Sequence, residues 1–466
     1  MFSFKDYIPF YKRNINLAVP VMITQAGQMI VQMADNIMVG HLGTAQFAGV
    51  SFSNNIFVMG MVFCICFTQG LIPYTGQNYG SGNYKEVASY FKNSFVLNLI
   101  MCAAILAIMF AIIPFMEYMG QDADILVYAK SYYSIMLFSL IPFIMFFTIR
   151  NFSEGIGITK YAMYITLATN ILNIFLNWVL IFGKCGFPQM GVSGAALATL
   201  ISRVIMFVSF AVIIFTLNDY KRFTTLIFSP GKSSKDSKLQ EVATEHFIEK
   251  EKIKDLLKTS TPIAFQGLIE VTAFSLSAIM VGWFGKIALA AHQIAMSMSS
   301  FSFMVAQGIG AAATIRVSHQ LGEKDFASTR KAGFAAMHMA TAFMGLAGLL
   351  YVLFRNHIPY LFTTDTEVIP IASTLLIICA GYQIFDALQL TGLASLRALM
   401  DVKIPLIFST FSYYGVCLPL GYLLGHTFNI GPIGIWLGLM AGLLFASILF
   451  LYRFNRITKR LIFNNK

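Results

Sequence analysis

Long apolar segments follow one another along almost the whole chain of 466 residues. A helix needs about 20 apolar residues to cross a bilayer, and helices are the expected form because backbone groups in lipid must be satisfied within their own segment. The expected spans are residues 17–40, 48–74, 94–115, 131–152, 161–183, 191–217, 259–283, 288–315, 332–354, 368–396, 405–425 and 433–452. The sequence therefore predicts an all-α polytopic membrane protein with twelve transmembrane helices.

The charged residues agree with this prediction in number and in placement. They make up 11% of the chain, whereas a soluble domain carries about a quarter. Of the 32 lysines and arginines, 27 fall in loops or at span ends on the side that holds both termini, and four (Lys130, Lys184, Lys286 and Arg355) fall on the other. Cytoplasmic loops carry this excess. We therefore expect cytoplasmic termini, and the net charge of +11 needs no nucleic-acid partner.

A charged segment divides the chain into two parts. Residues 218–258 contain sixteen charged residues, which indicates a cytoplasmic linker, and we expect its second half to form an amphipathic surface helix. The predicted organisation is an N-terminal six-helix lobe (1–217), the linker (218–258) and a C-terminal six-helix lobe (259–466).

The two lobes resemble each other at a constant offset. Adding 242 carries Pro20 to Pro262, Met38-Val39-Gly40 to Met280-Val281-Gly282, Gly43 to Gly285, Ala48 to Ala290 and Gly80 to Gly322, and adding 243 carries Gly191 to Gly434. A repeat of six spans inserts both copies in the same orientation, related by an axis along the membrane normal. We expect two pseudo-symmetric lobes, a substrate cavity between them and alternating access by rocking of the lobes.

Three carboxylates, those of Asp35, Glu270 and Asp386, lie inside the expected spans. An aspartate at a helix centre costs roughly 2.5–3.5 kcal/mol on insertion, and acids retained there usually serve ions, protons or substrates. A simple hydrogen bond to a neighbouring helix is the alternative. Arg203, also inside a span, is expected to have a structural role, either pairing with an acid of its lobe or bonding at a helix contact.

Polar side chains share the helix face of each acid. Gln25, Gln28 and Gln32 lead to Asp35, Gln266 and Ser277 accompany Glu270, and Tyr382 and Gln389 accompany Asp386, all at helical spacings. Such faces are expected to be hydrated or lined by protein.

The repeat shows that the lobes differ chemically. Asp35 aligns with Ser277, and Glu270 aligns with Gln28. The C-terminal lobe, with two acids and Tyr382, suits a cation site, and Asp35 has the amides of Asn173 and Asn177 as expected companions. Oxygen ligands suit a hard cation, and a desolvated carboxylate can instead carry a proton, so Na⁺ and H⁺ both remain open on these grounds.

Several short motifs resemble functional signatures but are expected only to pack helices together. Gly308 to Ala313 matches a dinucleotide fingerprint but lies in an apolar span without a preceding strand, and Gly434, Gly438 and Gly442 form a small-residue face. Five of the six cysteines lie in apolar segments, without metal-ligand spacing, and are read as buried hydrophobes. Nothing indicates an ATPase or hydrolase motif. We therefore expect no cofactor and an ion gradient as the energy source.

Three stretches resemble one known family over essentially the whole chain. They are ADNIMVGHLG (34–43), NIFLNWVLIFGKCGFPQMGVSGAALATLISR (173–203) and ALAAHQIAMSMSSFSFMVAQGIGAAATIRVSHQLGE (288–323). They resemble the multidrug and toxic compound extrusion (MATE) family, and GLIEVTAF with GYQIFDALQ resembles its NorM-type branch. The resemblance implies a monomeric, two-lobe antiporter of the bacterial cytoplasmic membrane that expels cationic drugs and dyes in exchange for Na⁺ or H⁺.

The resemblance also implies roles for individual residues. By position, Glu270, Tyr382 and Asp386 match the cation site of NorM-type proteins, with Glu270 and Asp386 as the expected Na⁺ ligands. Asp35 with Asn173 and Asn177 matches the N-terminal site that couples transport in other branches.

Some of those branches carry an acid where this chain has Asn177, which makes Na⁺ the first expectation. The remaining polar residues, expected to support the cation or the substrate, are Gln28, Gln32, Gln266, Ser277 and Gln389.

Two other functions compete with this interpretation. A flippase or an exporter of a specific lipid-linked or natural metabolite could use the same architecture, and a polar or strongly cationic central cavity would indicate it. A membrane enzyme or receptor would need a catalytic constellation or a sizeable extramembrane domain, and the sequence indicates neither.

Overall fold

The computed structural model describes residues 4–228 and 248–465, and it is helical throughout, with no strand in these two ranges. Twelve helical segments in the described chain are long and apolar enough to cross a membrane. The predicted all-α polytopic fold is therefore confirmed, and the prediction of twelve spans holds for the part of the chain that the structure describes. The helices extend beyond the expected spans at most ends, because polar first and last turns continue them past the apolar runs.

The contacts divide the chain into two bodies. The N-terminal body is Ala26–Ala264, and the C-terminal body is Met1–Gln25 together with Phe265–Lys466. Helix α1 (Ile8–Gly40) passes from the C-terminal body into the N-terminal body, and α9 (Lys250–Gly282) passes in the opposite direction. The bodies thus differ from the predicted lobes, 1–217 and 259–466. The first part of α1 belongs to the C-terminal body, and the first part of α9 belongs to the N-terminal body.

The N-terminal body is built around α5. The elements of this body between α1 and α9 are α2 (Thr44–Thr68), α3 (Leu71–Gly80), α4 (Tyr84–Ile112), η2 (Ile113–Met119), α5 (Ala123–Gly155), α6 (Lys160–Phe182), α7 (Gly191–Thr216) and α8 (Asn218–Phe228). Helix α5 packs against α2, α4 and α7, and its C-terminal stretch from Ile144 to Gly155 is buried throughout. An apolar core around Phe57, Tyr133 and Leu140 fills the space between these helices.

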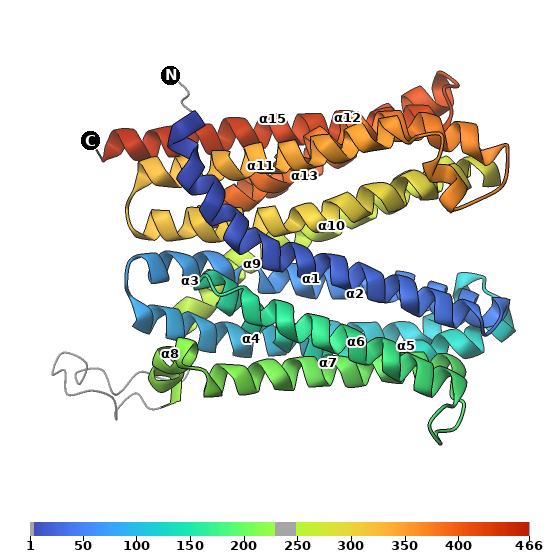
Figure 1. Cartoon of the computed structure of the whole chain (residues 1–466), viewed down its shortest axis with the longest axis horizontal. Coiled ribbons are helices and arrows are strands. Elements are labelled where there is room, and N and C mark those ends of the chain that lie inside the picture. Colours follow the sequence, from blue (N-terminus) through green and yellow to red (C-terminus); the bar gives the residue numbers. More distant parts are fainter. Residues whose placement is uncertain (1–3, 229–247, 466) are drawn as a thin grey trace. The chain divides into compact units, whose positions relative to one another are not determined.

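The C-terminal body is built in the same way around α12, which packs against α10, α11 and α15 (Figure 1). Its elements after α9 are α10 (Lys286–Gly322), α11 (Phe326–Leu353), η3 (Ile358–Leu361), α12 (Val368–Ala398), α13 (Lys403–Thr410), η4 (Phe411–Cys417), α14 (Leu418–Tyr422), η5 (Leu423–Thr427) and α15 (Pro432–Asn464). The eleventh span therefore runs from α13 to η5, and its two η segments are π-helical.

The internal repeat appears in the helix boundaries and in the turns. Helices α1 and α9 begin 242 residues apart and end 242 residues apart, and the starts of α4 and α11 are separated by the same number. Gly43 and Gly285 precede α2 and α10 with φ of 136° and 97°, a region that an L side chain rarely adopts. Asn83 and Asp325 each cap the following helix, accepting a hydrogen bond from the backbone N–H three residues later.

The small-residue faces pack helices together, as expected. A Cβ on Gly308 would lie 2.7 Å from the backbone nitrogen of Met22, and one on Gly438 would lie 2.5 Å from Cα of Gly421. Glycine allows these backbones to approach closely, which drives helix association in membranes. All six cysteines are free, and four of them are buried.

The second half of the linker, expected to form an amphipathic surface helix, is helical where the structure describes it. Lys250 to Lys258 form the first turns of α9 and continue directly into the seventh span. The linker's first residues form α8, which packs on α4 and α7. Residues 229–247 lie outside the described ranges.

Candidate functional site

The C-terminal body brings the two predicted acids together. Glu270 comes from α9 and Asp386 from the middle of α12, and their charges interact. Asp386 is 2% exposed and Tyr382, one turn before it, is 3% exposed. Both carboxylates therefore belong to one cluster, in which Asp386 is buried and Glu270 is half-buried.

Tyr413 completes this cluster and was not singled out by the sequence. It lies in the π-helical segment η4, is 1% exposed, and its hydroxyl interacts with the Glu270 carboxylate. Gln389 of α12 donates through Nε2 to the same hydroxyl at 3.1 Å. In the sequence, Tyr413 is an aromatic residue in an apolar run, and nothing there indicates a site. In the structure, the π-helical turn is the local feature that points to one, since such turns often occur at functional sites.

One carboxylate oxygen in the cluster lacks a partner. Asp386 Oδ2 is buried and accepts no hydrogen bond from the described residues. Gln389 Oε1 is in the same situation. Leaving a buried polar atom unsatisfied costs about 1–3 kcal/mol, and more for a charged group. The cluster therefore has unused oxygen atoms with which a cation or a proton can interact.

Arg397 corrects the sequence interpretation of the charges. It was counted with the loop after the tenth span, but it lies in α12, where Nη2 donates to Gln266 Oε1 at 3.0 Å. Gln266 is 2% exposed and donates in turn to Ser409 Oγ at 2.7 Å. Because Gln266 precedes Glu270 by one helical turn, the guanidinium faces that carboxylate, and the two charges interact. Two carboxylates and one arginine give the cluster a formal charge of −1.

Two buried aromatic side chains support the cluster from α10 and α15. Trp436 is fully buried, its ring centroid lies 5.8 Å from that of Tyr382, and its Nε1 donates to His292 Nδ1 at 3.1 Å. This packing limits the freedom of the Tyr382 ring next to Asp386.

The N-terminal body holds the second predicted cluster. Asp35 of α1 accepts a hydrogen bond from the Asn177 amide of α6, and Asn177 also donates to Asn173 Oδ1 at 3.2 Å. The expected grouping of these three residues is thus observed.

Arg203 lies in the same body as Asp35, and its charge interacts with that of the aspartate. It donates through Nη1 to Ser139 Oγ at 2.7 Å and lies over the Phe143 ring at 4.1 Å. These contacts are those of the expected structural residue.

The remaining expected residues are less engaged. Ser277 is buried and donates to Ala273 O of its own helix at 2.9 Å. Gln32 is exposed and Gln28 is half-buried. Gln25 of the polar stripe is instead bonded to Gln307 in the C-terminal body, with 2.6 Å between Nε2 and Oε1.

The donors available near Glu270 and Asp386 are oxygen atoms of carboxylates, hydroxyls and amides. Such hard ligands suit an alkali or alkaline-earth cation better than a transition metal. Within residues 4–228 and 248–465, no three or more His, Cys, Asp or Glu side chains group as a metal site would require. The donors present near Glu270 and Asp386 are therefore hard oxygen ligands.

A duplicated twelve-span helical bundle, with acids inside the spans of each body, defines a membrane transporter built from a parallel repeat. The family model described as MatE matches residues 20–179 and again residues 262–423. The two matches start 242 residues apart, the offset seen in the sequence. The chain belongs to the MATE family.

Known proteins place it more closely. It is similar to the Multidrug resistance protein NorM of Photobacterium profundum, with 30% identity covering 95% of this chain and 94% of the relative. NorM of Vibrio vulnificus strain YJ016 is 32% identical, covering 92% and 91%. A solved structure of a multidrug resistance MATE family transporter in an outward-facing conformation shares the fold, with a TM-score of 0.85 at 20% identity and coverage of 97% and 96%. The protein is thus a multi-pass membrane transporter of the NorM-type branch and not an enzyme.

Proposed function

We propose that this protein exports lipophilic organic cations in exchange for Na⁺, with H⁺ as the alternative coupling ion. The names of the NorM relatives support multidrug export. The observation that carries the proposal is that two acids, Glu270 and Asp386, lie together with one guanidinium, that of Arg397, so the cluster has a formal charge of −1 when both acids are ionised. A buried net charge is costly without a partner, and one monovalent cation neutralises it.

Within this proposal, Glu270 and Asp386 have different tasks. Arg397, held by Gln266, compensates Glu270, whereas Asp386 has an unpaired, buried oxygen. Asp386 is then the main ligand of the coupling ion, and Glu270, Tyr382 and Tyr413 complete its oxygen shell. A cationic drug and the ion compete for the same single negative charge, which is the basis of exchange.

The N-terminal cluster is proposed to assist coupling in a different way. Asp35 is compensated by Arg203 and bonded to Asn177, so this body carries no uncompensated intramembrane acid at that cluster. Asp35 is then expected to take a proton or a cation only when its surroundings change. The two copies of the repeat would alternate in access about the membrane normal, as parallel repeats do.

We further propose a bacterial cytoplasmic membrane location with both termini in the cytoplasm. The distribution of lysine and arginine supports this orientation. The inward-negative potential then favours entry of the coupling cation by about 2.3 kcal/mol per charge per 100 mV.

The proposal is tested with purified protein in liposomes loaded with ethidium. An imposed Na⁺ gradient is compared with an imposed pH gradient, and transport is followed by dye fluorescence. Asp386→Asn is expected to abolish gradient-driven transport, and Asp124→Asn, which changes an exposed acid at the start of α5, serves as the matched control. Transport of Asp386→Asn at the wild-type rate under both gradients would refute the proposed site, and no dye transport by the wild type would favour the exporter of a specific metabolite.

A further inference from the structure

The repeat places two pairs of residues at equivalent positions near the starts of α9 and α1. Tyr74 in α3 corresponds to Arg316 in α10, and Asp255 in α9 corresponds to Arg13 in α1, each pair 242 residues apart. In the N-terminal body, therefore, α3 lies at the first turns of α9. In the C-terminal body, the end of α10 lies at the first turns of α1. The two bodies fill this corner with different chemistry.

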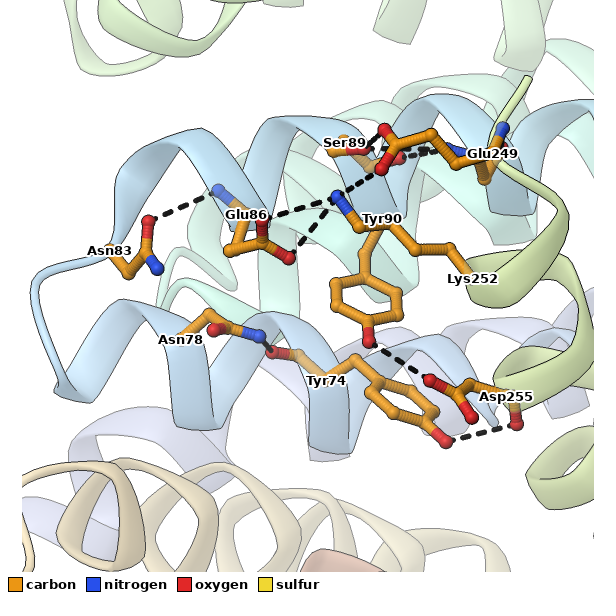
Figure 2. Close-up of polar contacts among 10 residues, drawn as sticks. Tyr74, Asn78, Asn83, Glu86, Ser89, Tyr90, Glu249, Lys252 and Asp255 are labelled. Atoms are coloured by element: carbon orange, nitrogen blue, oxygen red, sulfur yellow. Dashed lines mark hydrogen bonds and ion pairs between the residues drawn. The ribbon is translucent and has the colours of Figure 1, made fainter. Parts of the chain in front are cut away.

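In the N-terminal body the corner is closed by partners of its own, as Figure 2 shows. The Tyr74 hydroxyl donates to the Asp255 carbonyl oxygen at 2.9 Å, and the Tyr90 hydroxyl reaches Asp255 Oδ2 at 3.4 Å. The rings of Tyr74 and Tyr90 stack with centroids 4.6 Å apart. The side chain at the Tyr74 position thus meets a helix that supplies an acceptor.

The charges of that corner are also paired. Lys252 lies 3.2 Å from Glu86 Oε2 and 2.7 Å from Glu249 Oε2, and Glu249 accepts a further hydrogen bond from Ser89 (Figure 2). The backbone N–H of Glu249 donates to Asn93 Oδ1 at 2.8 Å. The charges of Glu249 and Lys252 at the start of α9 therefore have partners within the described part of the N-terminal body.

The equivalent corner of the C-terminal body is left with unsatisfied cationic donors. Arg316 is 8% exposed, and its Nε and Nη2 find no hydrogen-bond partner among the described residues. Its charge interacts with Arg13, where the other body has Asp255, and with Glu323. Glu323 is already engaged, because Gln320 Nε2 donates to it at 2.6 Å. The corner has donors and positive charge in excess of acceptors.

We propose that Arg316 and Arg13 bind a phosphate group, carried either by an anionic lipid or by dissolved phosphate. A buried guanidinium without acceptors is costly, and its fork of donors matches a phosphate in bidentate geometry. Arg13 is exposed, so the site opens to the membrane surface on the side rich in lysine and arginine. Basic pockets between helices on that side commonly take lipid head groups.

The test is thermal unfolding of the purified full-length protein in a zwitterionic detergent. Phosphatidylcholine is compared with phosphatidylglycerol, and sodium phosphate with sodium chloride at equal ionic strength. The wild type is expected to show a saturable rise in Tm with phosphatidylglycerol or with phosphate. A rise with the lipid alone assigns a head group, and a rise with phosphate alone assigns the dissolved ion. No rise with either overturns the proposal.

Two variants separate a phosphate site from general attraction of anions. Arg316→Met is expected to lose the rise and, without added anion, to be at least as stable as the wild type, because an unsatisfied buried charge is removed. Arg13→Asp restores the acid found at Asp255 and is expected to lose the rise by pairing with Arg316. Lys12→Gln, an exposed neighbour, is the matched control and keeps it. A wild-type rise in either arginine variant overturns the proposal, and so does loss of the rise in Lys12→Gln.

Discussion

Replacing Arg397 with methionine tests the charge argument for the cation site most directly. The substitution removes the guanidinium that faces Glu270 but keeps an unbranched, flexible side chain. The formal charge of the cluster changes from −1 to −2, with both acids still present. We expect the variant to bind its first coupling cation more tightly and to accommodate a second.

The size of the effect is an order-of-magnitude estimate. Arg397 is bonded to Gln266, which lies one helical turn before Glu270, and we take the Cβ spacing of such residues, about 6 Å, as the separation of the two charges. At an effective dielectric constant of about 20, two unit charges at that distance interact by about 3 kcal/mol. The affinity for the first Na⁺ should therefore rise by about 100-fold, with slower drug export because the ion leaves more slowly.

Trp436 provides the assay. Its ring packs against Tyr382, so its fluorescence should respond when an ion binds next to Asp386. A variant with Trp178 and Trp283 changed to phenylalanine leaves Trp436 as the sole tryptophan, and Na⁺ is titrated in this background with and without Arg397→Met. Arg355→Met, in the loop before η3, is the control for a general loss of positive charge. An Na⁺ affinity unchanged by Arg397→Met, or raised equally by Arg355→Met, would refute the reasoning.

Three smaller substitutions test individual contacts. Tyr413→Phe removes the hydroxyl that accepts a hydrogen bond from Gln389 and interacts with Glu270. We expect weaker Na⁺ binding with little change in Tm, and unchanged binding in the same fluorescence titration would exclude Tyr413 from the site. Asp325→Ala removes the cap of α11 and should cost about 1 kcal/mol in denaturant unfolding, whereas Asp325→Asn should cost much less; equal losses would contradict a capping role. Burial favours a higher pKa for Glu249, but hydrogen bonds from Lys252 and Ser89 outweigh it and hold the pKa below its ordinary value. This stabilisation is present above about pH 4.5 and is lost as the pH falls through the lowered pKa, so Glu249→Gln should lower Tm at pH 7 and reduce the loss of stability on acidification; parallel Tm curves for wild type and variant would contradict it.

Much of the architecture was predictable because it depends on local composition. Twelve apolar runs predict twelve spans, since each run must satisfy its own backbone in lipid. The offset between Gly43 and Gly285 predicts the repeat, because each glycine occupies a backbone conformation that other residues avoid. The polar faces around Asp35, Glu270 and Asp386 follow from helical periodicity alone.

The boundaries of the charged segments were less predictable. Arg397 and Arg316 follow apolar runs directly, and hydropathy assigned both to loops, whereas both lie inside helices. The start of α9 was expected to form an amphipathic surface helix in the linker, since Lys250 to Lys258 are strongly charged. It continues into the seventh span because contacts of Lys252 with Glu86 and Glu249 satisfy its charges. Arg397 is bonded to Gln266, whereas Arg316 keeps two donors without a partner among the described residues.

By itself the sequence determined the class of fold, the duplication and the presence of three membrane-embedded acids, because hydropathy and periodicity are properties of single segments. Only the tertiary structure decided the partners: Arg397 with Gln266 beside Glu270, Tyr413 with Gln389, and Arg316 with two donors that lack an acceptor among the described residues. Partnership depends on the rotation and depth of one helix against another, which contacts between different helices set. The charge of the cation site is therefore a tertiary property, although every residue that contributes to it is present in the sequence.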